Sequence, residues 1–164
     1  MSLIVSDSSV LIHLGAVGRL MLLKSLYGRV IVPPAVDIEI IEQGSNRPSV
    51  ASYRAAVSDG WIEKQMPFDQ ALITLLQQQL DWGEAQAIAL AIEQNATLIL
   101  IDDAHARDIA DLYQLPKIGT LGILLQAKQH GLITSIKEEL KTLRTHMWLS
   151  DQLVAKVLAA ANEA

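Results

Sequence analysis

The sequence predicts an α/β protein whose largely parallel sheet carries helices on both faces. Short apolar runs, rich in β-branched residues and free of charge, recur at 30–32 and 96–101 and are typical of buried strands. Between such runs lie longer segments with helical spacing or an Ala-rich composition, such as 84–93. The alternation predicts an α/β architecture, and a length of 164 residues predicts a single domain, 1–164.

Each expected strand is followed by at least one expected helix. Pro33–Pro34 stops one strand and begins a helix, and Gln43 to Pro48 is the best loop candidate. The strands are expected at 3–5, 30–32, 61–63, 96–101 and 115–118. The helices are expected at 10–14, 20–27, 34–42, 50–57, 69–80, 84–93, 104–113, 119–128, 133–143 and 151–161.

The composition argues against disulfides and against a membrane span. The chain has no Cys, which excludes thiolate metal sites and fits a reducing cytoplasm. No apolar run approaches the ~18 residues that a transmembrane helix needs. The start of the chain lacks the basic segment of a signal peptide. We therefore expect a cytoplasmic protein that does not enter a membrane.

The acidic residues are concentrated in one part of the chain. The net charge is −5, yet residues 81–111 alone contain seven acids and one base, Arg107, and so contribute −6. The remainder is close to neutral, which argues against a large basic face for non-specific nucleic-acid binding. A local acidic cluster in a nearly neutral chain indicates a site.

Carboxylates follow two of the expected strands directly. Asp7 ends the first strand, and Asp102 and Asp103 end the apolar run 96–101. A helix N-cap is an alternative for Asp7 and for one of the pair. The other member of the pair would then be repelled by its neighbour, unless Arg107 pairs with Asp103 across one helical turn.

Glu84 and Glu39 are two further candidates. Glu84 stands three residues after Asp81, as in a capping box, and a lone Glu39 on a helix is by default solvated. Because parallel strands end at the same edge of a sheet, however, several of these acids are expected to converge there. Oxygen ligands without nearby Cys or His suit Mg²⁺ or Mn²⁺.

Other chemistries lack the residues they need. The four His residues have no ligand spacing and are interpreted as having no role, and there is no Gly-rich phosphate loop and no Cys nucleophile. A metal-dependent phosphatase would have a second Asp two residues after Asp7, where Ser9 stands. A phosphoacceptor domain would carry its acid pair after the first strand, whereas here the pair comes late.

Four segments together resemble the PIN-domain ribonucleases, in particular small prokaryotic proteins with a DUF3368-type domain. They are Val5–Ile12, Leu80–Ala91, Leu98–Asp103 and Gly119–Gly122. The resemblance implies a three-layer α/β/α sandwich with a central, mostly parallel sheet. It also implies an acidic pocket that holds Mg²⁺ or Mn²⁺, and cleavage of single-stranded or structured RNA, often as the toxin half of a toxin–antitoxin pair.

The resemblance also implies roles for individual residues. Asp7 matches the first acid, Glu39 the second, Glu84 the third, and the pair Asp102–Asp103 the fourth, with Asp103 fitting the usual offset better. The metal ligands would be Asp7, Glu84 and Asp103 or Asp102.

Three further residues are expected to support the site. Ser9 matches the small hydroxyl that supports the first acid, and Arg107 or Thr120 could contact substrate phosphate. For Thr120, capping of its own helix is favoured. The expected partners are RNA, an antitoxin protein and a second copy of the chain in a homodimer. The alternative is a PIN-like module that binds RNA or protein but does not cut.

Overall fold

The computed structural model describes residues 2–43 and 47–164. Most of the loop expected between Gln43 and Pro48 lies outside the described residues. Pro48 itself begins a helix, with the ring at its first position, where no intrahelical N–H bond is lost.

The sheet has five strands, all parallel, in the order β3-β2-β1-β4-β5. The expected α/β class with a parallel central sheet is thereby confirmed. The apolar strands β1, β2 and β4 occupy the middle of the sheet, whereas β3 and β5 form its edges. The strands are β1 (Ile4–Ser6), β2 (Val30–Val32), β3 (Ile62–Lys64), β4 (Leu98–Leu100) and β5 (Lys117–Ile118).

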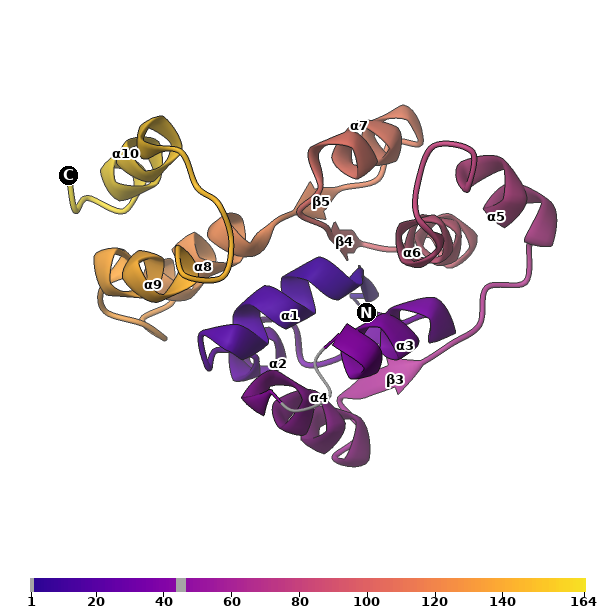
Figure 1. Ribbon diagram of the computed structural model, residues 1–164, viewed down its shortest axis with the longest axis horizontal. Helices are drawn as coiled ribbons and strands as arrows, with labels where there is room; N and C mark the ends of the chain where they lie inside the picture. The colour runs from indigo at the N-terminus through magenta and orange to yellow at the C-terminus, as the bar shows by residue number, and fades with distance from the viewer. Residues whose placement is uncertain (1, 44–46) are drawn as a thin grey trace.

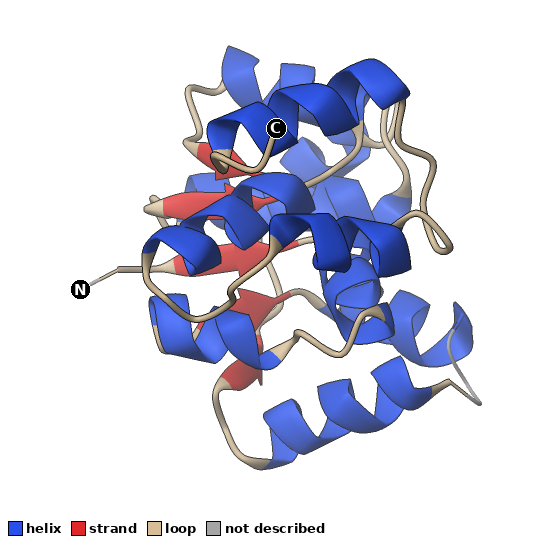
Figure 2. Cartoon of the chain, turned by 90° about the vertical axis from the view of Figure 1, so that its left-hand side faces the viewer, coloured by secondary structure: helices blue, strands red, loops and turns tan. Residues whose placement is uncertain are grey.

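Helices cover both faces of this sheet (Figure 2). Helix α8 contacts both α1 and α2, and α4 packs against α1, while α6 packs on β1 and β4 and contacts α5 (Figure 1). The helices are α1 (Ser8–Ala16), α2 (Met21–Tyr27), α3 (Pro34–Gln43), α4 (Pro48–Ser58), α5 (Gln70–Leu76), α6 (Trp82–Glu93), α7 (Ala104–Leu112), α8 (Thr120–Gln129), α9 (Ile136–Leu143) and α10 (Asp151–Ala160). Among the described residues, no single helix has the length and apolar character of a membrane span.

Two helices are shorter than expected. Helix α5 stops at Leu76 instead of residue 80, because the exposed residues 77–79 offer no apolar side chain to bury and form turns. Helix α9 starts at Ile136 instead of 133, because the Ser135 hydroxyl accepts the N–H of Glu138 and caps the helix there.

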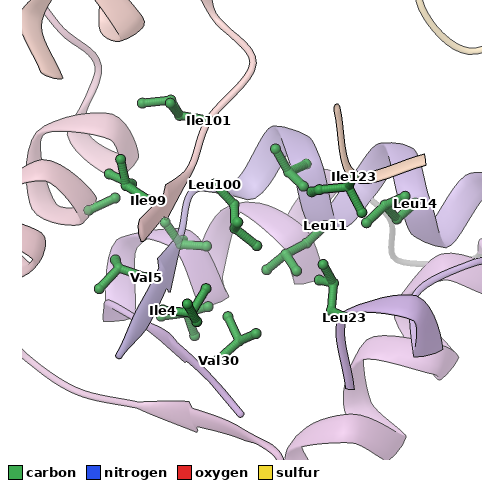
Figure 3. Close-up of a cluster of buried hydrophobic side chains, with 14 of the residues drawn as sticks. Ile4, Val5, Leu11, Leu14, Leu23, Val30, Ile99, Leu100, Ile101 and Ile123 are labelled. Carbon is green, nitrogen blue, oxygen red and sulfur yellow. The ribbon is translucent and has the colours of Figure 1, made fainter. Parts of the chain in front are cut away.

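The core lies between the sheet and its helices. Val5, Ile99 and Leu100 are fully buried, and they lie with Leu11 and Ile123 of the flanking helices in one apolar cluster (Figure 3). Burying each such side chain stabilises the fold by about 1.5–3 kcal/mol. The three central strands are therefore anchored in the core.

The order of the strands reverses between β1 and β4. From β1 the chain moves to β2 and β3 on one side, then returns to place β4 and β5 on the other. Ser6 is in register with Leu100, and the N–H of Asp7 donates to the Leu100 carbonyl at 3.0 Å. Ligands of open α/β sheets bind outside the carboxyl ends of the strands at such a reversal. The carboxylates after β1 and β4 stand at this position.

Candidate active site

Asp7 is buried with one carboxylate oxygen unused. Its side chain is 1% exposed, and Oδ1 accepts the N–H of Val10 at 3.2 Å, so the expected N-cap of α1 is present. Oδ2 is buried and has no hydrogen-bond partner among the described residues. Burial, with the nearby charges of Asp102, Glu84 and Asp81, raises the pKa of Asp7 well above its ordinary value. A cation at Oδ2 would give that oxygen a partner and would offset the charges of the neighbouring acids.

Asp102 differs from Asp7: its side chain is partly buried, 13% exposed, and both of its oxygens accept hydrogen bonds. Oδ1 accepts the backbone N–H of Thr120 at 2.7 Å, and Oδ2 accepts the Thr120 hydroxyl at 2.6 Å. Burial alone would raise the pKa of Asp102, but the hydrogen bonds from His13 and Thr120 outweigh it and hold the pKa below its ordinary value. Asp102 is therefore a fixed anion.

Thr120 does not cap its own helix, so that expectation is wrong. Gly119 holds the cap position of α8, and both polar groups of the buried Thr120 are directed to Asp102. A Cβ at Gly119 would stand 2.7 Å from Asp102 Oδ1. Glycine is thus what lets Asp102 approach the first turn of α8, where the N–H groups and helix dipole favour an anion.

His13 is a site residue that the sequence did not indicate. Its Nδ1 lies 2.8 Å from Asp102 Oδ2. An ionised carboxylate has no hydrogen to donate, so Nδ1 carries it and His13 is the donor. The two residues are 89 positions apart and lie on α1 and beyond β4. No spacing in the sequence indicates this contact, which becomes visible only in the folded structure.

Glu39 points inward and joins three elements. Its Oε2 accepts the Ser8 hydroxyl at 2.5 Å, and its Oε1 accepts the N–H of Gly83 at 3.1 Å. Burial raises the pKa of Glu39, although the Ser8 hydrogen bond opposes that shift. A Cβ at Gly83 would stand 2.8 Å from Glu39 Cδ, so the absence of a side chain there admits the carboxylate. The default interpretation of Glu39 as a solvated residue is thus wrong.

Ser8 supports an acid, whereas the resemblance pointed to Ser9. Ser8 is buried and donates to Glu39. Ser9 is half-buried and lines a hollow of about 790 Å³ beside His13, and no hydrogen bond joins its side chain to Asp7 in the described chain. The prediction that Ser9 supports the first acid remains a prediction.

Glu84 forms the capping box that its spacing indicated. Its N–H donates to Asp81 Oδ1 at 2.8 Å, and its Oε1 accepts the Asp81 N–H at 3.2 Å. Burial and the charge of Asp81 raise the pKa of Glu84 to about 7. The capping and metal-binding interpretations are compatible, since one cap bond leaves Oε2 available.

Asp103 is exposed and caps α7, accepting the N–H of Ala106 at 2.8 Å. The expected pair between Asp103 and Arg107 is not formed. Arg107 Nη1 instead donates to the Ile101 carbonyl at 2.9 Å, which fixes the guanidinium beside the end of β4. Of the acid pair, Asp102 is thus the partly buried member and Asp103 the exposed one.

The donor set fits a hard divalent cation. It consists of carboxylate oxygens from Asp7, Glu84, Asp102 and Asp103. Burial, together with the charges of neighbouring acids, raises the pKa of Asp7 and of Glu84. Within residues 2–43 and 47–164, no three His, Asp or Glu side chains are already gathered closely enough to enclose an ion. The unpartnered Oδ2 of Asp7 is the observation that points to a cation here.

The comparisons with known proteins agree with this arrangement. The family model DUF3368, described as a PIN domain, matches residues 3–163. No curated protein matches the chain. Since the match spans nearly the whole chain and the parallel sheet with its acidic edge agrees with it, the chain belongs to the DUF3368 family of PIN domains.

Proposed function

We propose that the protein is a ribonuclease that hydrolyses RNA phosphodiester bonds with Mg²⁺ or Mn²⁺ as cofactor. The observation that carries the proposal is the buried, unpartnered Oδ2 of Asp7 among other acids at the reversal of the sheet. Such a carboxylate costs stability unless a cation binds it, and functional sites are where such costs are retained.

Asp7, Glu84 and Asp102 or Asp103 would hold the metal. A bound ion of this type supplies a water of lowered pKa and positive charge against the phosphate oxygens. His13 and Thr120 keep Asp102 ionised and fixed, so its orientation needs no adjustment when substrate arrives. Glu39 ties the start of α1 to the start of α6, which holds Asp7 and Glu84 at a constant separation.

The test is cleavage of a labelled RNA with and without Mg²⁺ or Mn²⁺, using the wild type, Asp7→Asn and Asp69→Asn. Asp69 is the matched control, because it also caps a helix through one oxygen, accepting the N–H of Leu72 on α5. We expect metal-dependent cleavage by the wild type and Asp69→Asn, and none by Asp7→Asn. Equal cleavage by all three proteins would contradict the proposal.

A binding module that does not cut is the second candidate. It is favoured by one observation: Glu84 and Asp103 are both engaged in helix caps, which leaves fewer free oxygens for a metal. Titration calorimetry with Mn²⁺ separates the two, since metal binding without cleavage of any RNA would support the module and exclude the nuclease.

A toxin role, an antitoxin partner and a homodimer rest on the resemblance and on the need for basic surface. Induced expression tests the toxin role: growth should stop with the wild type and continue with Asp7→Asn. Unimpaired growth with abundant, cleavage-competent wild type would contradict it. Sedimentation of the purified protein tests the homodimer, which a monomer at high concentration would exclude.

A further inference from the structure

A hollow of about 490 Å³ opens beside Asp102. Its lining includes Asp102, Arg107, Lys117, Leu121, Met147 and Trp148. The size falls within the range of small-ligand pockets, about 300–1,000 Å³. One part of the lining is apolar, and the other carries two cations and the carboxylate of Asp102, in a chain whose net charge is −5.

Trp148 has the most exposed large apolar side chain among those described, at 86%. It belongs to the segment between α9 and α10 (Figure 1). That segment is fixed: Arg144 Nη2 donates to the Leu149 carbonyl at 3.0 Å and to Asp151 Oδ1 at 2.7 Å, and Leu149 is buried. The indole is thus presented to solvent by an anchored segment.

The two cations lie where a phosphate would approach Asp102. Arg107 has five N–H donors and uses one of them on the Ile101 carbonyl in the described structure. Lys117 pairs with the exposed Asp111, an ion pair of the kind that contributes little and that a phosphate can replace. Arg107 is also the one base among the acids of residues 81–111.

We infer that this hollow is a subsite for one nucleotide of single-stranded RNA, with its base stacked on Trp148 and its phosphate facing Arg107 and Lys117. The inference rests on the proposed nuclease function and adds to it the residues that would hold one nucleotide beside the acids. Bases in a duplex are covered on both faces by their neighbours, so only an unpaired base can stack on the indole. Aromatic side chains beside cations are how proteins hold single strands without reading sequence.

The test uses a short fluorescein-labelled RNA, single-stranded or annealed to its complement, with dissociation constants measured by anisotropy in EDTA. The variants are Trp148→Leu, Trp148→Phe and the control Phe68→Leu, which alters another exposed aromatic residue, 75% exposed. Stacking is worth about 1–3 kcal/mol per base, so Trp148→Leu should weaken single-strand binding about 10-fold. Phe68→Leu should leave it unchanged, and Trp148→Phe should retain most of it.

Cleavage of the same RNA with Mn²⁺ separates failure of the subsite from failure of the nuclease. If Trp148→Leu binds and cleaves single strands like the wild type, the subsite is refuted and the nuclease stands. If the wild type neither binds nor cleaves RNA, the proposed function fails as well. Equal weakening for single strands and duplex, or loss of self-association with unchanged RNA binding, would also overturn the stacking role.

Discussion

Asp7 and Asp102 follow neighbouring strands, β1 and β4, and both carboxylates are withdrawn from solvent. Three donor groups from His13 and Thr120 surround Asp102, and its pKa is lowered. Asp7 receives one N–H, one of its oxygens has no hydrogen-bond partner within residues 2–43 and 47–164, and its pKa is raised. The same edge of the sheet thus carries one carboxylate whose charge is stabilised by hydrogen bonds and one carboxyl group whose charge is not. The first contributes stability, whereas the second is the place for a ligand.

The largest effect on the free energy of unfolding should come from removing the hydrogen-bonded carboxylate of Asp102. Asp102→Ala leaves the His13 ring and both Thr120 donors without their acceptor, so the free energy of unfolding should fall by about 3 kcal/mol. Urea denaturation measures it. Asp108→Ala, an exposed position on α7, is the control and should stay within about 0.5 kcal/mol of wild type. A loss as small as that control's would contradict the contrast between Asp102 and Asp7.

A bound metal ion should supply the partner that Asp7 lacks in the described structure and Asp102 already has, and should therefore stabilise the folded protein. A metal that binds only the folded state adds about 2.7 kcal/mol at a concentration of 100 Kd, which raises the Tm by about 5–10 °C. We expect this shift with Mn²⁺ or Mg²⁺ for the wild type, and its loss with EDTA or in Asp7→Asn. An equal shift in both proteins would place the metal elsewhere.

Replacing the carboxyl group of Asp7 by an amide should stabilise the metal-free protein. Asp7→Asn keeps an oxygen for the Val10 N–H and removes a buried carboxyl group whose ionisation is opposed by burial and by other acids, so the free energy of unfolding in EDTA should rise by about 1 kcal/mol. The effect is opposite in sign to that of Asp102→Ala. Urea denaturation of the wild type, Asp7→Asn and Asp69→Asn measures it, and a marked loss of stability in Asp7→Asn would contradict the contrast.

The smallest effect concerns Glu84 and pH. Its folded-state pKa of about 7 lies above the ordinary value of 4.5, so between these values the folded state binds more protons than the unfolded state. The free energy of unfolding in EDTA should therefore fall as the pH rises through this window, and less steeply in Glu84→Gln. Because Glu84 is half exposed, we expect a difference below about 1 kcal/mol between the two proteins from pH 5 to pH 8. Identical pH profiles would contradict it.

The sequence predicted well what depends on neighbours in the chain. The parallel strands, the acids at their ends, the capping box of Glu84 and a cap within the pair 102–103 all follow from local patterns. The hydrogen bonds that stabilise the charge of Asp102 join it to Thr120 and His13, which are 18 and 89 positions away. No local pattern specifies these bonds. The same holds for Glu39, which is drawn inward by Ser8, 31 positions away.

The pairing of β1 with β4 has a consequence for how the protein is made. Ser6 and Leu100 are in register, so Asp7 and Asp102 meet only after the chain has closed a loop that contains β2, β3 and six helices of the described structure. Closing so long a loop is among the slow steps of folding. Under the proposed function, a chain still emerging from the ribosome has no complete acidic site. Its own message is therefore safe from cleavage by that unfinished chain.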